Sequence, residues 1–468
     1  MAATPTVIGA VVVIAIAWDW LWRAGVPTIA TGLLTLVIVV ALGATLPARR
    51  RASVALAAGA VVFAAATGAR TSPWLVLVDL PVAMGLLLLA VNVNGGGRLD
   101  DLGIVSMLRR LGRLVLSALR APGWVLGPAT RTGMGSTAAP VLRGLALATP
   151  VVIVLALLLA SGDAVFADLV DVNFDIGTLG GHVVLLVMGL LVAATLAVQA
   201  ASPDVRDPRT TVRVLGTVEA ATLLACLVAL FAVFVLTQVV TLLGGAQHVL
   251  ETADLTRAEY ARSGFFQLLA VAALTLLTLG TVRGVVQTDD ARGHRRVQLL
   301  MATAIVLTLA IVAVAIGRLT LYTGAFGLTM LRLYSMIFAA WIGVVFVALG
   351  AAVAGVGADH RWLLPFAAAT GIATLLVLNA VNVEGRVVDY NVDRWQRVDR
   401  VDLDYLTTEL EADAVPALVA ATERLQPAQG GHLRGAICAG FTGDASNTGL
   451  SFNLAQHRAN AALATACP

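Results

Sequence analysis

Eleven long apolar runs occupy the first 383 residues of the chain, and they constrain its fold more than any other feature. A bilayer core about 30 Å thick is spanned by roughly 20 apolar residues in a helix. Hydrophobic residues make up 59% of the chain and charged residues only 13%, far from the composition of water-soluble domains. Because the runs are continuous rather than alternating, they predict membrane-spanning helices and not a transmembrane β-barrel.

The predicted fold class is all-α: a polytopic helical membrane bundle of about 11 transmembrane helices that fills residues 1–383. The seventh and tenth runs exceed the length that a perpendicular helix needs, which predicts tilted helices or helices that continue into the interface. The predicted spans are 6–22, 27–46, 52–69, 73–91, 141–160, 179–201, 213–242, 263–283, 297–317, 328–354 and 362–382.

Residues 384–468 are polar enough to form a module outside the bilayer. Helical spacing at 413–425 and 451–466 predicts a small, mostly helical unit, with the Gly-rich stretch 430–449 between the two helices and Ser451 as a cap. About 85 residues bury only a small core, so a disulfide or docking onto the membrane domain would stabilise the module.

The distribution of arginine, which supplies all 31 basic residues, predicts the orientation of the bundle. The loops after the second, fourth, sixth, eighth and tenth spans hold 18 arginines, and the opposite loops hold six. Basic residues stay cytoplasmic, so the N-terminus is predicted to be cytoplasmic and, with an odd number of spans, the C-terminus extracytoplasmic.

The positions of the three cysteines agree with this orientation. Cys226 lies inside the seventh span, where a thiol usually behaves as a small buried hydrophobe. Cys438 and Cys467 lie in the tail, on the side of the membrane that permits disulfides, and we expect them to form a bridge. The alternative is two unrelated free thiols in a cytosolic tail, which would follow if the span count were wrong by one.

A cytoplasmic segment, 98–130, has the pattern of a basic amphipathic helix. Arg109, Arg113 and Arg120 recur on one face, and leucine and valine residues occupy the other. Such a helix lies in the headgroup layer, so residues 98–120 are predicted to bind anionic lipid, with docking of a cytoplasmic partner as the alternative.

A few charged and phenolic side chains are predicted to lie at a similar depth near the outer ends of the first, fourth and tenth helices. Charges inside a bilayer usually face a partner or a water-filled cavity. One hypothesis is a site for an ion or anionic substrate, or a proton-coupled switch; the other is a structural ion-pair network that fastens the helices. His182 and Gln238 are isolated polar groups, interpreted as interhelical hydrogen-bond partners. The residues of the outer-leaflet cluster are Asp19, Asp79, Arg318, Tyr322, Arg332 and Tyr334.

Several enzyme classes are excluded because their minimum equipment is absent from the sequence. Without lysine there is no phosphate-binding loop of the Walker type and no Schiff base. No zinc-protease, redox-dithiol or nucleophile-elbow motif occurs, and the six histidines are scattered. We therefore expect no catalytic residues, no cofactor, no metal site and no nucleic-acid partner.

Three stretches of the chain carry recognisable motifs: Glu259–Leu268, Arg318–Tyr334, and the group formed by Asn379–Asn382, Tyr390–Arg394, Leu403–Leu406 and Asp413–Leu418. The motifs contain Tyr260 and Arg262 as well as the arginines and tyrosines of the tenth helix region. Together the stretches resemble a bacterial multi-pass membrane family, catalogued as domain of unknown function 4173, and the related 4153 group. The resemblance extends over about residues 140–420, and one departure is Phe326, where tyrosine is expected.

The resemblance implies a location in the bacterial envelope but no activity. Two functions therefore stay open. The first is a non-enzymatic envelope scaffold, accessory or sensory subunit whose outer tail contacts a protein partner. The second is a secondary transporter or channel for a small solute or ion that uses the outer-leaflet cluster, with Asp79 and Pro81 at a possible helix break.

Overall fold

The computed structural model of the protein divides the chain into two compact units. The first contains the described parts of 1–205, 407–419 and 432–468, and the second those of 206–406 and 420–431. The structure describes residues 4–45, 50–94, 179–201, 217–240, 265–286, 290–356, 362–398, 401–444 and 446–467.

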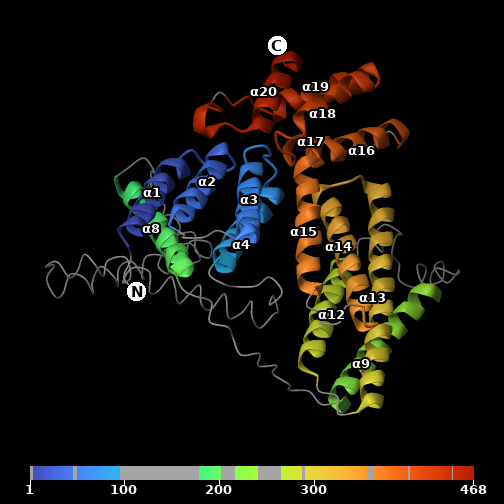
Figure 1. The fold of residues 1–468 in the computed structure, drawn as a ribbon. Helices are drawn as coiled ribbons and strands as arrows, with labels where there is room; N and C mark the ends of the chain where they lie inside the picture. Colours follow the sequence, from blue (N-terminus) through green and yellow to red (C-terminus); the bar gives the residue numbers. More distant parts are fainter. Residues whose placement is uncertain are drawn as a thin grey trace, which may run out of the picture. The chain divides into compact units, whose positions relative to one another are not determined.

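Within these residues, the first unit has five apolar helices, which Figure 1 shows in blue and green. α3 packs along α4, and α1 packs along α8. The approach of α1 to α8 depends on Gly189, where a Cβ would lie only 2.7 Å from the Cβ of Trp18. Small residues of this kind let apolar helices come close enough for van der Waals contact in a membrane. The helices are α1 (Pro5–Trp22), α2 (Ile29–Ala44), α3 (Arg51–Ala66), α4 (Pro73–Asn94) and α8 (Leu179–Ala201).

The helices of the first unit run between two ends of a bundle. At one end the α1–α2 and α3–α4 connections touch, since a Cβ on Gly68 would lie 2.9 Å from the Cα of Ile29. At the other end the amide of Arg50, before α3, donates to the side chain of Asn94 at the end of α4 (3.3 Å). α8 begins beside the C-terminal end of α1 and runs antiparallel to it, because His182 contacts Arg23 (2.9 Å).

The second unit is a bundle of apolar helices with one amphipathic helix, α16. Its core consists of fully buried side chains such as Leu224, Leu279, Ile342 and Phe346. α16 alternates buried valines with polar residues, and it contacts α14. The helices are α9 (Thr217–Val240), α12 (Phe265–Val285), α13 (Ala291–Phe326), α14 (Met330–Val353), α15 (Leu363–Ala380) and α16 (Val383–Val398).

Ten of the eleven predicted spans coincide with apolar helices, and six of the described helices are long and apolar enough to cross a membrane. α13 is longer than predicted, with 36 residues, because it continues as a helix beyond its apolar part, where hydropathy gives no signal. The total of about 11 spans stays a prediction. The span 141–160, the surface helix 98–130, Tyr260 and Arg262 lie outside the described residues.

The tail is helical, as predicted, but residues 384–468 contribute segments to both units. Between the two predicted helical segments, the Gly-rich stretch 430–449 begins inside a further helix, α19. Gly430 is used for close packing, since a Cβ there would clash with the carbonyl oxygen of Thr422. The cap of the last helix is Asn453 rather than Ser451. The helices after α16 are α17 (Leu403–Thr408), α18 (Val415–Arg424), α19 (Pro427–Gly440) and α20 (Leu454–Ala466).

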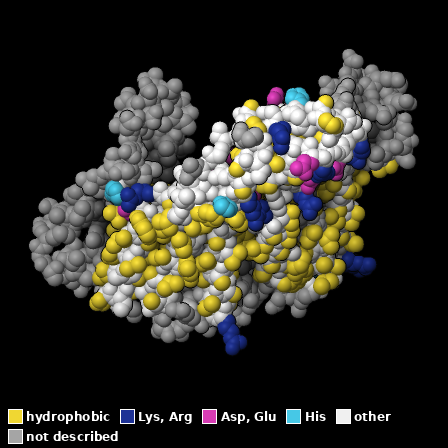
Figure 2. Space-filling view, turned by 90° about the horizontal axis from the view of Figure 1, so that it is seen from above, with side chains coloured by type: hydrophobic (Ala, Val, Ile, Leu, Met, Phe, Trp, Pro, Cys, Tyr) yellow, Lys and Arg dark blue, Asp and Glu magenta, His cyan; other side chains and the backbone are white. Residues whose placement is uncertain are grey.

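Apolar side chains cover broad areas of the surface, and charged side chains are few (Figure 2). Leu77, Val218 and Leu321 are 70%, 76% and 73% exposed on three different helices. Cys226, predicted to be buried, is exposed on α9 as well. An apolar surface of this extent is stable against lipid and not against water, which together with the six long helices indicates a membrane-embedded protein.

Candidate functional site

The residues of the predicted outer-leaflet cluster are divided between the two units. Asp19 and Asp79 belong to the first unit, whereas Arg318, Tyr322, Arg332 and Tyr334 belong to the second. Within the second unit the structure brings Arg332 and Tyr322 together, with the guanidinium carbon 4.3 Å from the centre of the ring. The predicted contact of Asp19 and Asp79 with the two arginines stays a prediction.

Asp19 is paired inside the first unit. Its Oδ2 accepts from Arg23 Nη2 at 3.1 Å and contacts Nδ1 of His182 at 3.0 Å. Nη1 of Arg23 also lies 2.9 Å from Nε2 of His182. A guanidinium can only donate, so this Nε2 accepts and the ring proton sits on Nδ1, directed at Asp19. His182 is thus an interhelical hydrogen-bond partner, as predicted.

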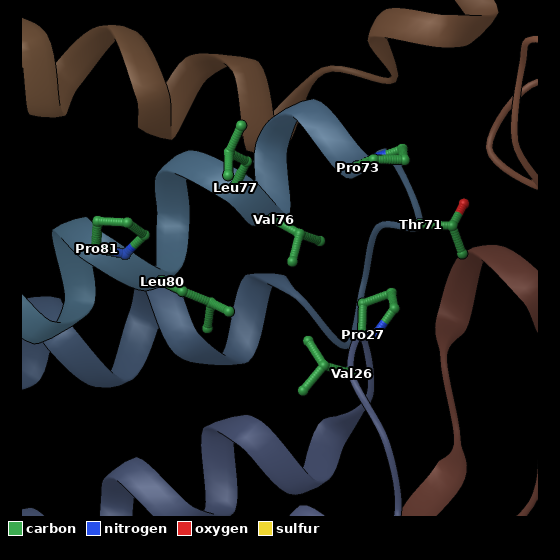
Figure 3. Close-up of a pocket in the computed structure, with 8 residues that line it drawn as sticks. All are labelled: Val26, Pro27, Thr71, Pro73, Val76, Leu77, Leu80 and Pro81. Carbon is green, nitrogen blue, oxygen red and sulfur yellow. The ribbon is translucent and has the colours of Figure 1, made fainter. Parts of the chain in front are cut away.

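Asp79 is only 1% exposed and lies in α4, two residues before Pro81. Other residues of α4 line an open, mostly apolar groove with a volume of about 590 Å³, and Asp79 is not among its lining residues. Pro27 and Thr71 line the groove from the two inter-helix connections, and Leu77 and Pro81 line it from α4 (Figure 3). Pro81 has no N–H, so the carbonyl of Leu77 lacks its regular helical donor at this place.

The most extensive polar site of the first unit is the junction between the tail and the two inter-helix connections, which we call the tail junction (Pro27–Ile29, Thr67–Thr71, Asp413 and Asn447–Leu454). Asp413 is 4% exposed and accepts from Arg70 Nη1 at 3.0 Å. Its other oxygen accepts from the amide of Thr71 at 2.7 Å and from the Thr71 hydroxyl at 3.2 Å. Both oxygens of this buried carboxylate are therefore occupied by structural donors.

Asn453 is the second centre of the tail junction. Its Nδ2 donates to the carbonyl oxygens of Pro27 (3.1 Å), Thr67 (3.0 Å) and Arg70 (3.0 Å). Its Oδ1 accepts from the first amides of α20, so the same side chain caps that helix. One amide group thus joins three carbonyls of two separate connections to the start of the last helix.

Backbone bonds and a disulfide complete the junction. The amide of Ile29 donates to Phe452, and the amide of Leu454 donates to Gly68, at 3.0 and 2.8 Å. Cys438 of α19 and Cys467 after α20 form the predicted disulfide, with their Cα atoms 5.7 Å apart. The bridge ties the two helices that flank the docked segment.

One titratable group near the junction has a shifted pKa. Partial burial of the carboxyl raises the pKa of Glu411 above its ordinary value, although the residue as a whole is exposed, and the charge of Asp413 raises it further. Both effects disfavour the ionised form of Glu411. One acid close to the junction is therefore harder to ionise in the folded protein than in the unfolded chain.

In the second unit, two of the motifs from the sequence meet at the α13–α14 turn. Asn391 of α16 accepts from the amide of Leu328 at 3.0 Å and donates to its carbonyl at 2.7 Å. Arg394 donates to the carbonyl oxygens of Gly324 and Ala325. Gly327 has φ 84°, and a Cβ there would clash with Oδ1 of Asn391. The motif residues of α16 thus hold the backbone of the turn.

The remaining predicted residues surround this turn. Arg332 donates from Nη1 to the carbonyl oxygen of Gly327. Arg318 donates to Oε1 of Gln238 at 2.8 Å, so Gln238 is an interhelical partner, as predicted. Tyr334 is half-buried on α14. Tyr405 of α17, which also belongs to a motif, accepts from the first amide of α14 at 2.7 Å.

The sequence pointed to Asp413 and Asn391 as members of motifs, but it gave no role to Asn453 or Arg70. The partners of Asn453 are backbone carbonyls. Every residue has a backbone carbonyl, so the sequence does not indicate which ones Asn453 binds. In the residues that the structure describes, no group of three or more histidine, cysteine or acidic side chains is placed to hold a metal ion. Asp413 and Asn453 of the tail junction and Asn391 and Arg394 at the α13–α14 turn are engaged with backbone groups or with other side chains.

One comparison with known proteins gives a match. A family model described as Domain of unknown function (DUF4153) matches residues 52–421. This supports the 4153 group of the resemblance; membership of the 4173 group stays a prediction. No curated protein and no solved structure matches the chain.

Proposed function

The chain belongs to the DUF4153 family, and we propose that it is a non-enzymatic scaffold, accessory or sensory subunit of the bacterial cell membrane. In this proposal the membrane helices carry the docked C-terminal segments as a surface for another envelope protein. The six long apolar helices provide the anchor.

The observation that carries the proposal is the tail junction. Asp413 and Asn453 are buried, and their side-chain atoms bind Arg70, Thr71 and backbone groups rather than facing a cavity. A satisfied buried polar network fixes one arrangement and leaves its groups unavailable for chemistry. The junction therefore holds α20 rigidly in one position. The outward face of α20 exposes His457, Arg458 and Ala461.

We further propose that the N-terminus is cytoplasmic and the tail extracytoplasmic. The arginine count puts the α1–α2 and α3–α4 connections outside, and the tail junction puts 447–454 on the same side as both connections. The disulfide between Cys438 and Cys467 supports the same side, since extracytoplasmic space permits disulfides. In intact cells both cysteines should react with an impermeant maleimide only after reduction. If the two cysteines are labelled only after the cells are permeabilised, the tail is cytoplasmic and the proposed orientation is wrong.

Site-specific photo-crosslinking in growing cells tests the scaffold function. A photoreactive residue would replace His457 or Ala461 on the exposed face of α20, one at a time. We expect a discrete adduct of the same mass from both positions. The matched control carries the photoreactive residue at Val233, which is exposed on the apolar surface of α9, and should not give that adduct.

The variant Asn453→Ala, which undocks the tail, should lose the adduct while the protein stays in the membrane. Diffuse adducts that are equally strong from Val233 and indifferent to Asn453→Ala would contradict the proposal.

One observation favours the transporter alternative: Asp79 is buried in α4 two residues before the interior proline. Proteoliposomes test it directly. Flux of an ion that is lost in Asp79→Asn but kept in Asp389→Asn, an exposed acid outside the bundle, would establish transport and overturn the scaffold proposal.

A further inference from the structure

The charge of Arg332 has no carboxylate partner in the part of the chain that the structure describes. Its contacts are with neutral groups: the carbonyl oxygen of Gly327 and the face of Tyr322. An arginine has five N–H donors, and Gly327 uses one of them. At the end of a membrane-spanning helix, the N–H groups of an arginine that have no protein acceptor need an anion or water as a hydrogen-bond partner.

The surroundings of Arg332 add further donor capacity. Arg332 lies in the first turn of α14, a 24-residue helix, where the partial positive charge of the helix favours an anion. The amides of Met330 and Arg332 have acceptors in Tyr405 and Thr329. Among the described residues the amide of Leu331 has no acceptor, so the first turn of α14 has one free backbone donor.

Three apolar side chains near this turn are exposed on the surface of the unit. Leu321, Phe326 and Leu331 are 73%, 52% and 43% exposed. Free inorganic phosphate would match the donors alone. A phospholipid matches both features, because its phosphate fits a guanidinium in a bidentate manner and its acyl chains fit the exposed apolar side chains.

We propose that the guanidinium of Arg332, which lies over the ring of Tyr322, and the amide of Leu331 form a binding site for the phosphate of an anionic phospholipid. The lipid belongs to the leaflet at the α13–α14 turn, and its chains lie along Leu321 and Phe326. One phosphodiester neutralises the charge of Arg332. This site is distinct from the basic segment 98–120, and it does not depend on the proposed scaffold function.

Native mass spectrometry of the full chain, purified in mixed phosphatidylglycerol and phosphatidylcholine, tests the site. After stepwise delipidation we expect Arg332→Gln to retain one phosphatidylglycerol fewer than the wild type, with about a fivefold weaker preference over phosphatidylcholine. Arg332→Lys, which keeps the charge, should retain most of that preference. Arg424→Gln is the matched control, because Arg424 is already paired with Asp389 and Asp393.

Two measurements on the wild type keep the proposal falsifiable even if Arg332→Gln does not fold. Phosphatidylglycerol should raise the melting temperature more than phosphatidylcholine at equal lipid, and millimolar inorganic phosphate should not displace the retained lipid. Displacement by inorganic phosphate would identify a free-anion site instead. Equal retention in the wild type and a folded Arg332→Gln, or equal loss in Arg424→Gln, would overturn the proposal.

Discussion

The side-chain nitrogen of Asn453 lies 3.0 Å from the carbonyl oxygen of Thr67, although 386 positions separate the two residues. Asn453 caps the last helix, and Thr67 follows the third. Because the same nitrogen also reaches Pro27 and Arg70, a single residue of the tail fixes how two helix connections of the first unit meet. The stability of that unit therefore depends on a residue from the far end of the chain.

Replacement of Asn453 by alanine should destabilise the first unit strongly. It removes the donor from three carbonyl oxygens at a buried position, and each buried group left unsatisfied costs about 1–3 kcal/mol. We expect a loss of roughly 3 kcal/mol or more, measured by thermal unfolding in detergent. Arg458→Ala, at an exposed position of the same helix, should cost less than about 1 kcal/mol. Equal effects of the two substitutions would contradict the importance of the junction.

The buried pair of Asp413 and Arg70 should be far more sensitive than an exposed pair. Asp413→Asn leaves the guanidinium of Arg70 buried without its counter-charge, which costs about 3–5 kcal/mol. Asp389→Asn breaks an ion pair with Arg424 in which both side chains are more than 40% exposed, and it should cost less than about 1 kcal/mol. Unfolding by denaturant compares the two. A double variant with Arg70→Gln should cost less than the sum of the single changes.

The contribution of Glu411 to the free energy of unfolding should fall as the pH rises. Its pKa is raised in the folded state, so over a range above the ordinary value of 4.5 the folded protein binds more protons than the unfolded chain. Stability then falls as the pH passes from that value through the raised pKa. Glu411→Gln removes this term, so melting temperatures measured from pH 4 to 8 should fall less steeply than in the wild type. An unchanged slope would contradict the assignment.

Gly327 should not tolerate alanine, whereas Gly324 should. Gly327 has a positive φ, and a Cβ there would meet Asn391, so Gly327→Ala should cost at least about 1–3 kcal/mol. Gly324 lies in the last part of α13 with nothing within 4 Å of its virtual Cβ, and alanine there should stabilise the helix by about 0.5–1 kcal/mol. Thermal unfolding should show a lower melting temperature for Gly327→Ala and a higher one for Gly324→Ala, and this result would support the geometry of the turn.

Apolar periodicity and length were enough to predict most of the helices. Lipid and helix core both select apolar side chains, so the runs at 179–201 and 328–354 coincide closely with α8 and α14. The two ends of α13, with Arg295 and Phe326, were not predictable from hydropathy. These ends continue the helix because packing against neighbouring helices stabilises it, and the apolar composition of the sequence does not show this.

The candidate sites were predictable only where residue type carried the signal. Arg332 and Tyr322 stand out because a charge and a phenol are rare beside a span, and the structure brings them together. Asn453 gives no such signal, since asparagine is common in polar tails and its partners are main-chain carbonyls. Asp19 was recognised as unusual, but its pairing with His182 depends on the antiparallel placement of two helices distant in sequence.

The tail junction also sets an order of events during synthesis. The carbonyl of Arg70 leaves the ribosome 383 residues before its donor, Asn453, which at about 5–20 residues per second is a delay of roughly 20 to 80 s. During that interval α1 to α4 insert and pack without the bonds that join their connections. A nascent chain interrupted before residue 453 would leave these three carbonyls without the donor that Asn453 supplies.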